Sequence, residues 1–525
     1  MKKTSHHLIV TVLLLSSATL CGGIKLSAVF GNHMVLQQGE PVPVWGSSDP
    51  EETIKVTFDG QTKSTKADKN GNWMIKLDAL KANAKGQDLR VNERTFKDVL
   101  IGEVWICSGQ SNMAWTVRGS ANPQEEAADA NYPAIRHIKV PQVPSDRREK
   151  TFNASWQVCN PQTAGNFTAV GYYFGRRLHK ELKVPIGLIN SSWGGTRIEP
   201  WIPMEGFELI KEQAFAKSTL DLIESVDPAT KKGRARHMAG IEAMRNWVEE
   251  AEKAVKTGNF PPKQPVAANI NLGNSHQSST RLYRGMIHPL VPFAVKGAIW
   301  YQGESNGSEG KSYYHKKHGL VRGWREAFSQ DDLSFYWVQL ANFTTDRKIP
   351  SGGDGYARVR DAQRNAQDIP GTGMAVIIDI GETGDIHPKN KQDVGARLAQ
   401  WALSRDYGKE IVPCGPLYQN HKVEKGKVLI NFDHVGSGLI IGKKEGLKPT
   451  EEIVIEGKLE RFSIAGKDKV WYWANALIQE NSVVVSHPEV PNPVAVRYAY
   501  SANPIGANLY NREGIPASPF RTDDW

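Results

Sequence analysis

The sequence predicts an α/β protein whose doubly wound parallel sheet is flanked at both ends of the chain by β-rich, sandwich-like regions. Three observations predict this fold class. Between residues 99 and 405, apolar runs alternate with amphipathic helical patterns, which is typical of a parallel sheet covered by helices. Residues 24–98 instead place apolar side chains at alternate positions, which is typical of half-buried strands. Residues 406–525 contain short runs rich in valine and isoleucine, such as 428–430 and 483–485, which are also typical of strands.

The first 23 residues are predicted to be a secretory signal peptide. A basic start is followed by the apolar run Leu8–Leu20 and then by the small residues Gly22 and Gly23. We therefore expect a secreted or periplasmic protein. A lipoprotein attached through Cys21 is the less favoured alternative, because the residue before this cysteine is bulky. No later apolar run approaches the roughly 18 residues that span a bilayer, so no internal membrane segment is expected.

Composition excludes several classes of protein. The chain has 525 residues, of which 40% are hydrophobic, and 15 tryptophans, so it is neither disordered nor collagen-like. The net charge is +9, but the basic residues are spread out and the densest cluster, at 231–236, suits a solvated helix start. No nucleic-acid partner is therefore expected. Cys107, Cys159 and Cys414 lack the spacing of a disulfide framework or a zinc site, and no metal or cofactor is predicted.

Residues 24–98 are predicted to form a small β-sandwich-like domain. Apolar and polar residues alternate over 54–58 and over 73–77. The Asn70–Gly71 pair between these two stretches predicts a hairpin turn, because both residues tolerate positive φ.

The catalytic part is predicted to span residues 99–405. Residues 205–280 interrupt its alternation and are predicted to be a helical insertion, because apolar residues between Met244 and Val255 recur at helical spacing. In such sheets the reacting groups gather at the carboxyl ends of the strands. Buried strands are expected at 99–107, 185–190, 295–301, 333–340 and 374–380, and helices at 170–182, 312–328 and 391–404.

Ser111 is the candidate nucleophile. It lies where the strand at 99–107 ends in a glycine-containing turn, which would direct its hydroxyl into the crevice at the sheet edge. An ordinary helix N-cap serine remains the alternative. The motif is not the GxSxG elbow, because Met113 stands where the second glycine would be.

His387 is the candidate general base. It follows the apolar run 374–380 after a short polar loop, and Asp385 lies two residues before it. A histidine with an orienting carboxylate can take the proton of a serine hydroxyl. A plain surface-loop histidine is the alternative. Two other His-Pro pairs, at His288 and His487, do not follow predicted strands of this sheet.

Two further turns offer hydrogen-bond donors. Gly194 and Gly195 follow the strand at 185–190 and would expose backbone N–H groups. Gln302 and Asn306 follow the strand at 295–301 and carry side-chain amides. Donors of this kind stabilise the oxyanion that forms during acyl transfer.

Four blocks of residues resemble those of the sialate O-acetylesterase family within the SGNH (GDSL-like) hydrolases. The resemblance continues into other parts of the chain, and it implies an SGNH-hydrolase-like catalytic domain that needs no cofactor. The four blocks are Ser108–Met113, Trp193–Thr196, Trp300–Asn306 and Asp385–Pro388, and the further matches are Asn32–Gln37, Gly285–Leu290, Asn508–Asn511 and Pro519–Arg521.

The resemblance implies catalytic roles for particular residues. Ser111 would be the nucleophile and His387 the base, and the oxyanion hole would consist of the Ser111 N–H, the Gly194 N–H and the Gln302 amide. Related hydrolases often carry a carboxylate three residues before the histidine, but Gly384 stands there. We take Asp385 as the third member of the triad.

Several roles stay open. Asp379 or a backbone carbonyl could orient the imidazole in place of Asp385. Asn306 is an alternative oxyanion donor. Glu304 and Asn306 are also candidates for substrate contacts. Arg197 could pair with a substrate carboxylate, or it could form a structural salt bridge.

The residues described above leave three functions open. The first is a secreted esterase that removes O-acetyl groups from sialic acids through a serine acyl-enzyme. The second is an esterase acting on acetylated xylan or another plant polysaccharide, because serine chemistry recognises only the acetyl group. The third is a non-catalytic glycan-binding protein, which the joint presence of a serine, a histidine and oxyanion donors disfavours.

Overall fold

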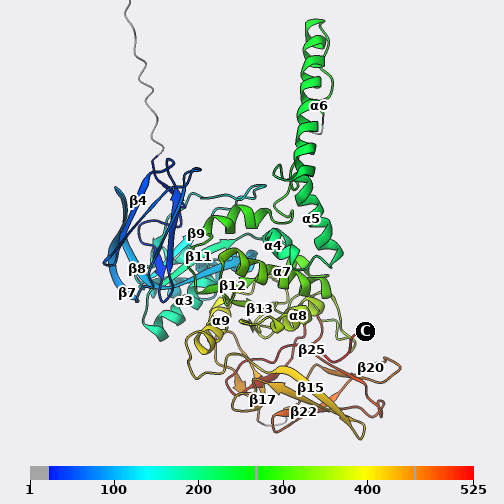
Figure 1. Cartoon of the computed structure of the whole chain (residues 1–525). Helices are drawn as coiled ribbons and strands as arrows, with labels where there is room; N and C mark the ends of the chain where they lie inside the picture. Colours follow the sequence, from blue (N-terminus) through cyan, green and yellow to red (C-terminus); the bar gives the residue numbers. More distant parts are fainter. Residues whose placement is uncertain (1–22, 266–269, 455–456) are drawn as a thin grey trace, which may run out of the picture.

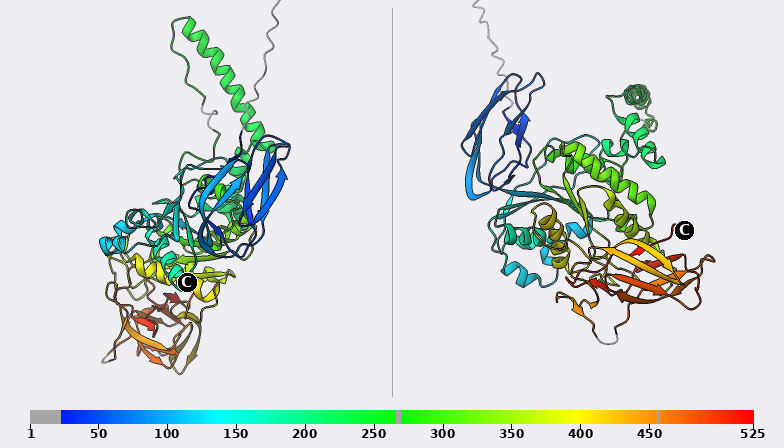
Figure 2. Two further views of the ribbon diagram at one scale, coloured as in Figure 1. Left: turned by 90° about the vertical axis from the view of Figure 1, so that its left-hand side faces the viewer. Right: turned by 60° about the horizontal axis from the view of Figure 1, so that its bottom comes forward.

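The computed structural model describes residues 23–265, 270–454 and 457–525 (Figure 1). The predicted signal peptide lies outside these residues, except for Gly23. Strands near the N-terminus lie beside a central α/β part, and the C-terminal strands lie on its other side (Figure 1; Figure 2). None of the helices in the described residues is both long enough and apolar enough to cross a membrane.

The N-terminal strands form two sheets. One has the order β1-β3-β6, and the other joins β2, β4, β5 and β7 to the first half of the long strand β8. These strands are β1 (Lys25–Leu26), β2 (Val35–Gln37), β3 (Val42–Ser47), β4 (Thr53–Phe58), β5 (Gln61–Lys66), β6 (Asn72–Leu77), β7 (Asn83–Val91) and β8 (Arg94–Gly109).

The hairpin turn lies elsewhere than predicted. β4 pairs with β5 across Asp59 and Gly60, both of which have positive φ. The pair Asn70–Gly71 instead connects β5 to β6, which lies in the other sheet beside β3. The prediction was wrong because the polar strand β5 shows no alternation of apolar residues.

The central sheet has the strand order β10-β9-β11-β8-β12-β13-β14, and all of its pairs are parallel except β10 with β9. Four predicted strands are present, but the one predicted at 374–380 ends at Ala375. Beyond it, the Arg397 guanidinium bonds the carbonyl of Val376 at 2.8 Å, where a neighbouring strand would bond in a sheet. The bounds are β9 (Ile135–Lys139), β10 (Gln157–Val158), β11 (Ile186–Ser192), β12 (Gly297–Tyr301), β13 (Ser334–Val338) and β14 (Thr372–Ala375).

Helices cover both faces of this sheet. Phe335 and Tyr336 are neighbours in β13 and therefore point to opposite faces. The ring of Phe335 packs on Trp324 of α7, and the ring of Tyr336 stacks on Trp401 of α9. α3 packs against α9 and β11. The bounds are α3 (Ala169–Leu182), α7 (Lys311–Phe328), α8 (Gly355–Asn365), which the sequence patterns did not predict, and α9 (Lys391–Arg405).

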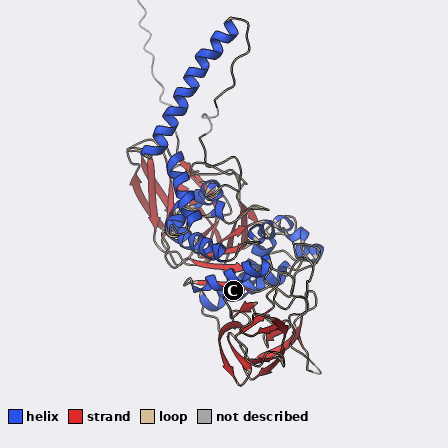
Figure 3. Ribbon diagram, turned by 90° about the vertical axis from the view of Figure 1, so that its right-hand side faces the viewer, coloured by secondary structure: helices blue, strands red, loops and turns tan. Residues whose placement is uncertain are grey.

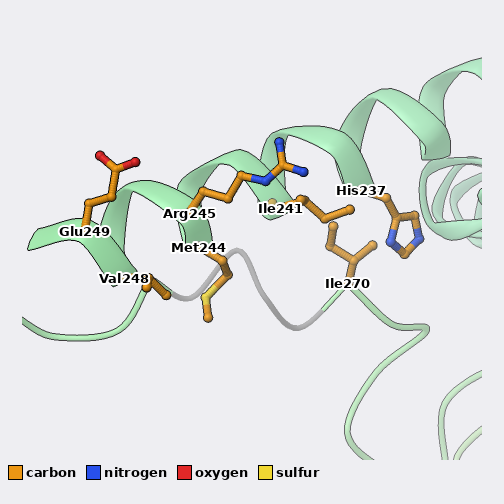
Figure 4. Close-up of a pocket in the computed structure, with 8 residues that line it drawn as sticks. His237, Ile241, Met244, Arg245, Val248, Glu249 and Ile270 are labelled. Carbon is orange, nitrogen blue, oxygen red and sulfur yellow. The ribbon is translucent and has the colours of Figure 1, made fainter. Parts of the chain in front are cut away.

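A long helix projects from the body of the molecule (Figure 1; Figure 3). This helix, α6 (Lys231–Lys256), contains the residues whose helical spacing predicted it, and it follows α4 (Met204–Glu208) and α5 (Ala214–Val226). Apolar side chains on α6, among them Ile241 and Met244, line a hollow that Ile270 of the returning chain also lines (Figure 4). The residues that line this hollow include none of the candidate catalytic residues.

The C-terminal region is β-rich, as predicted. Its strands form three sheets with the orders β15-β16-β22-β21, β18-β17-β24 and β20-β19-β23-β25. The three cysteines of the described residues, Cys107, Cys159 and Cys414, are buried and form no disulfide. The bounds are β15 (Leu417–Glu424), β16 (Lys427–Asp433), β17 (Leu439–Lys443), β18 (Glu451–Glu452), β19 (Phe462–Ala465), β20 (Trp471–Trp473), β21 (Asn475–Gln479), β22 (Ser482–Ser486), β23 (Ala495–Tyr498), β24 (Leu509–Asn511) and β25 (Phe520–Arg521).

Candidate active site

Ser111 lies at the carboxyl end of the central strand β8. It is the first residue of the short helix α1 (Ser111–Ala114). Gly109 ends β8 with a φ of 137°, and a Cβ at this position would lie only 2.1 Å from the carbonyl oxygen of Tyr301 in β12. Glycine is therefore required where the chain turns out of the sheet, and this turn places the serine at the sheet edge.

His387 comes from the loop between β14 and α9, 276 residues along the chain from Ser111. The Ser111 hydroxyl donates to His387 Nε2 at 2.9 Å. The indole of Trp115 stacks on the imidazole, with ring centroids 4.9 Å apart and planes 16° from parallel. This stacking fixes the plane of the ring, so its nitrogen faces the hydroxyl.

Asp385 is the carboxylate that contacts the imidazole. Its Oδ1 lies 3.3 Å from His387 Nδ1 and accepts the His387 backbone N–H at 2.8 Å. The Lys389 ammonium bonds its other oxygen at 2.5 Å. Asp379 was the alternative carboxylate for this role. Its two oxygens instead accept hydrogen bonds from the Arg397 guanidinium at 2.6 and 2.7 Å.

Charges around the loop set two pKa values. Hydrogen bonds from Lys389 and from the His387 backbone lower the pKa of Asp385 to about 2. Burial lowers the pKa of His387 below its ordinary value, the positive charges of Lys391 and Lys389 add to this effect, and Asp385 opposes it. A lowered pKa favours the neutral imidazole, which is the form that can accept a proton.

Gly194 lies against the serine. It follows β11, which runs parallel beside β8, so both chain turns emerge at the same edge. A Cβ at Gly194 would lie 3.3 Å from the Cβ of Ser111. The Ser111 N–H is the first of its helix and has no acceptor there, and in the described part of the chain the Gly194 N–H donates to no backbone carbonyl. Two backbone donors thus lie next to the hydroxyl.

Gln302, the third predicted oxyanion donor, is placed differently. Its side chain is fully buried, and its Nε2 donates to the carbonyl of Thr196 at 3.1 Å and to Asn306 Oδ1 at 2.8 Å. Both amide hydrogens are therefore engaged, and Gln302 offers no free donor to the site. The prediction from the motif is corrected: this amide supports the turn that follows Gly194.

The three candidate substrate contacts are also engaged within the protein. Asn306 is buried and its amide donates to Glu199 and Glu309. Arg197 pairs with the same two carboxylates, although 42% of its side chain is exposed. Glu304 accepts from Asn112 at 2.6 Å. Arg197 therefore forms the structural salt bridge that was its alternative role. The prediction for Asn306 is corrected: its amide is buried and bonds other protein groups.

Residues of the segment after α6 reach the site, which the sequence patterns did not reveal. Gln277 Nε2 donates to the Gly195 carbonyl at 2.7 Å, and Gln277 Oε1 accepts the Arg197 N–H at 2.9 Å. His276 stacks on Trp193 with centroids 4.6 Å apart. These contacts hold the glycine turn from its outer side. No local motif marks them, because they lie in a polar loop.

Within residues 23–265, 270–454 and 457–525, no group of three or more His, Cys, Asp or Glu side chains could hold a metal ion.

Comparison with known proteins agrees with this geometry. The family model described as "Carbohydrate esterase, sialic acid-specific acetylesterase" matches residues 101–233 and 268–404, ranges that contain the serine and the imidazole. The sialate O-acetylesterase of Mus musculus is 31% identical over 552 residues, covering 95% of this chain and 94% of the relative. That of Rattus norvegicus is 31% identical over 457 residues, covering 78% of this chain and 79% of the relative.

A solved structure is similar over almost the whole chain. It is a carbohydrate acetylesterase from Xanthomonas citri, 34% identical, with a TM-score of 0.77, and the match covers 96% of this chain and 100% of that one. Taken together with the family model, which covers half of the sequence, this shows that the chain belongs to the carbohydrate esterase family of sialic acid-specific acetylesterases.

Proposed function

We propose that this protein is an SGNH-type esterase that hydrolyses O-acetyl groups on sialic acids through a serine acyl-enzyme. The observation that carries the proposal is the hydrogen bond of 2.9 Å from the Ser111 hydroxyl to His387 Nε2. A nucleophile bonded to a base, with a carboxylate on the far nitrogen, is the arrangement that activates serine.

The first half of the reaction forms the acetyl-enzyme. His387 takes the proton of Ser111 as the Oγ attacks the acetyl carbonyl, and the carbonyl oxygen becomes an oxyanion. The N–H groups of Ser111 and Gly194 stabilise this oxyanion. The bond to the sugar oxygen then breaks, and the sugar hydroxyl leaves with the proton held by His387.

The second half releases acetate. Water gives a proton to His387 and attacks the acetyl carbon, and the same backbone donors stabilise the second oxyanion. The bond to Ser111 Oγ breaks and the serine recovers its proton. Asp385 stays ionised throughout, because its pKa is about 2, and it favours the imidazolium that forms in each half.

Replacing Ser111 tests the chemistry. The variant Ser111→Ala is expected to release no acetate above background from p-nitrophenyl acetate or from O-acetylated sialic acid, because no nucleophile remains. Its melting temperature should match that of the parent, since the serine is half-buried and the substitution is small. Full residual acetate release would remove Ser111 from the mechanism.

The sugar is tested by comparing substrates. Support for sialic acids comes from the name of the family that matches and from the names of the relatives of mouse and rat. We expect kcat/KM for O-acetylated sialic acid to exceed that for acetylated xylan. The opposite order would replace the proposed substrate with a plant polysaccharide, and acetate release from neither would leave glycan binding without catalysis.

The signal peptide over 1–23 and the secreted or periplasmic location are also proposed. The same holds for the division into residues 24–98, a catalytic domain over 99–405 with an insertion near 205–280, and residues 406–525. Cell fractionation and N-terminal sequencing of the exported protein test the location. A mature chain beginning at a lipid-modified Cys21 would favour the lipoprotein instead.

A further inference from the structure

Asn112, the residue next to the nucleophile, is a buried junction between three parts of the chain. Its Nδ2 donates to Glu304 Oε1 at 2.6 Å and to the carbonyl of Ile386 at 3.0 Å. Its Oδ1 accepts from Lys391 Nζ at 2.6 Å. The side chain is fully buried and its amide is used on both sides, so α1 is bonded directly to the loop that carries the base.

Lys391 holds the same loop from the other side. It is the first residue of α9, it is fully buried, and its ammonium also donates to the carbonyl of Pro388 at 2.6 Å. The two carbonyls bonded by Asn112 and Lys391 belong to the residues directly before and after His387. The imidazole is therefore held at both of its backbone neighbours.

The charges of this cluster are unusual for a protein interior. Burial lowers the pKa of Lys391 to about 7, although the carboxylate of Glu304 opposes the shift. Burial likewise raises the pKa of Glu304. The buried Lys391 amine and the partly buried Glu304 carboxyl bond the same amide and lose part of their hydration, and groups perturbed in this way concentrate at functional sites.

We propose that Lys391 is a positioning residue that holds the His387 imidazole against the Ser111 hydroxyl. It acts through Asn112 and through the two carbonyls that flank the imidazole residue. The inference rests on the proposed function, in which the hydroxyl and the imidazole start the reaction. The bridge explains how a base in a loop keeps its distance to a nucleophile on another element.

A positive charge here also affects the protonation of the base. The charged groups that act on His387 are Asp385 and Lys389 of its own loop and Lys391 of α9. Removing the Lys391 charge would raise the pKa of the imidazole, so the acid limb of the rate profile would move to higher pH. A residue that only supported the fold would not move this limb.

The variant Lys391→Met tests the proposal. For p-nitrophenyl acetate we expect kcat to fall about 10–100-fold, because a misplaced base loses the near-attack geometry, with KM changed less than about twofold. The matched control is Lys444→Met. Lys444 is also a buried cation that contacts α9, where it pairs with Asp393 at 2.7 Å. We expect this control to keep its kcat and the position of its acid limb.

A second variant shows whether the bridge acts as a unit. Asn112→Ala should lower kcat in the same direction, and the double variant with Lys391→Met should lose little more than either single one, since both break one connection. If Lys391→Met fails to fold, Asn112→Ala alone carries the test against the same control. A kcat for Lys391→Met within twofold of the parent, or an equal loss in Lys444→Met, overturns the proposal.

Labelling of the nucleophile separates this inference from the proposed function. A fluorophosphonate probe forms an Oγ–P bond at an activated serine and releases fluoride as the base takes the proton, so no sugar is needed. Slower labelling of Ser111 in Lys391→Met supports the inference, and an unchanged rate overturns it. A parent that is labelled but releases no acetate ends the proposed function alone, whereas a parent that is neither labelled nor active ends both.

Discussion

At the scale of single residues, a methyl group at position 194 would press on the nucleophile. A Cβ there would lie 3.3 Å from the Cβ and 3.6 Å from the Cα of Ser111. We expect Gly194→Ala to lower kcat for p-nitrophenyl acetate by about 10²–10³, the cost of displacing one oxyanion donor. Gly384→Ala is the control, because a Cβ there meets nothing within 4 Å. Equal kcat values in both variants would contradict this role.

The charge of Asp385 gives a prediction in pH. Asp385 raises the pKa of His387, against burial and two lysines. Asp385→Asn should therefore move the acid limb of kcat/KM to lower pH, because loss of the negative charge destabilises the protonated imidazole and lowers the pKa of His387. The kcat at pH 7 should also fall, by less than the roughly 10⁴-fold typical of buried triad carboxylates, since 39% of the Asp385 side chain is exposed. A limb displaced to higher pH would contradict the assignment.

Residue types in motifs showed which groups could react, but not how each is directed. The structure places His387 Nε2 2.9 Å from the Ser111 hydroxyl and Gly194 against Ser111. Gln302 stands in the same kind of block, yet its amide hydrogens bond Thr196 and Asn306. A motif records that an amide is present, whereas its direction depends on acceptors contributed by distant segments.

At the scale of elements, the parallel sheet explains why distant motifs converge. β11 and β12 both pair with β8 in parallel, so the turns after these three strands lie at one edge. Apolar runs predicted these strands because both faces of the sheet are covered. The same reasoning failed for β5, a polar strand, and for residues 376–380, which are apolar except for Asp379 and continue beyond the end of β14. Burial alone does not distinguish a strand from a buried turn.

The loop that carries Gln277 gives a prediction at this scale. Gln277→Ala removes both hydrogen bonds that hold the glycine turn at Gly195 and Arg197. We expect kcat to fall several-fold to about tenfold with little change in KM, since the Gly194 donor becomes less well placed. Gln264→Ala, an exposed glutamine beside α6, is the matched control. The same kcat in both variants would show that the turn holds its shape alone.

At the scale of the whole molecule, one strand connects two parts. β8 begins among the N-terminal sheets, where it pairs with β7 and β2, and it ends in the central sheet before Ser111. One continuous cluster of buried apolar residues includes side chains from Val29 to Phe520, and a separate small cluster contains Ile223, Val226 and Leu272. The N-terminal strands therefore support the strand that presents the nucleophile. The change in sequence pattern near residue 98 did not reveal this connection, because it falls inside β8.

The projecting helix is expected to be dispensable for catalysis. The family model leaves out residues 234–267, and the element that α6 chiefly contacts is α5. Replacing residues 241–263 with a short Gly/Ser linker should leave kcat/KM for p-nitrophenyl acetate within about twofold of the parent. The Gln277→Ala variant serves as the comparison, because it alters the same returning segment at its far end. A tenfold loss on shortening would show that the helix influences the active site.

Burial leaves the three cysteines of the described residues unreactive. It raises the pKa of the Cys159 thiol to about 11 and those of Cys107 and Cys414 even further above their ordinary values. Thiolate is the form that attacks alkylating reagents, so these positions stay silent while the protein is folded. In protein from which residues 1–23, and with them Cys21, have been removed, a cysteine introduced at the tip of α6 would then take up a maleimide dye selectively, and fluorescence could report on single molecules during turnover.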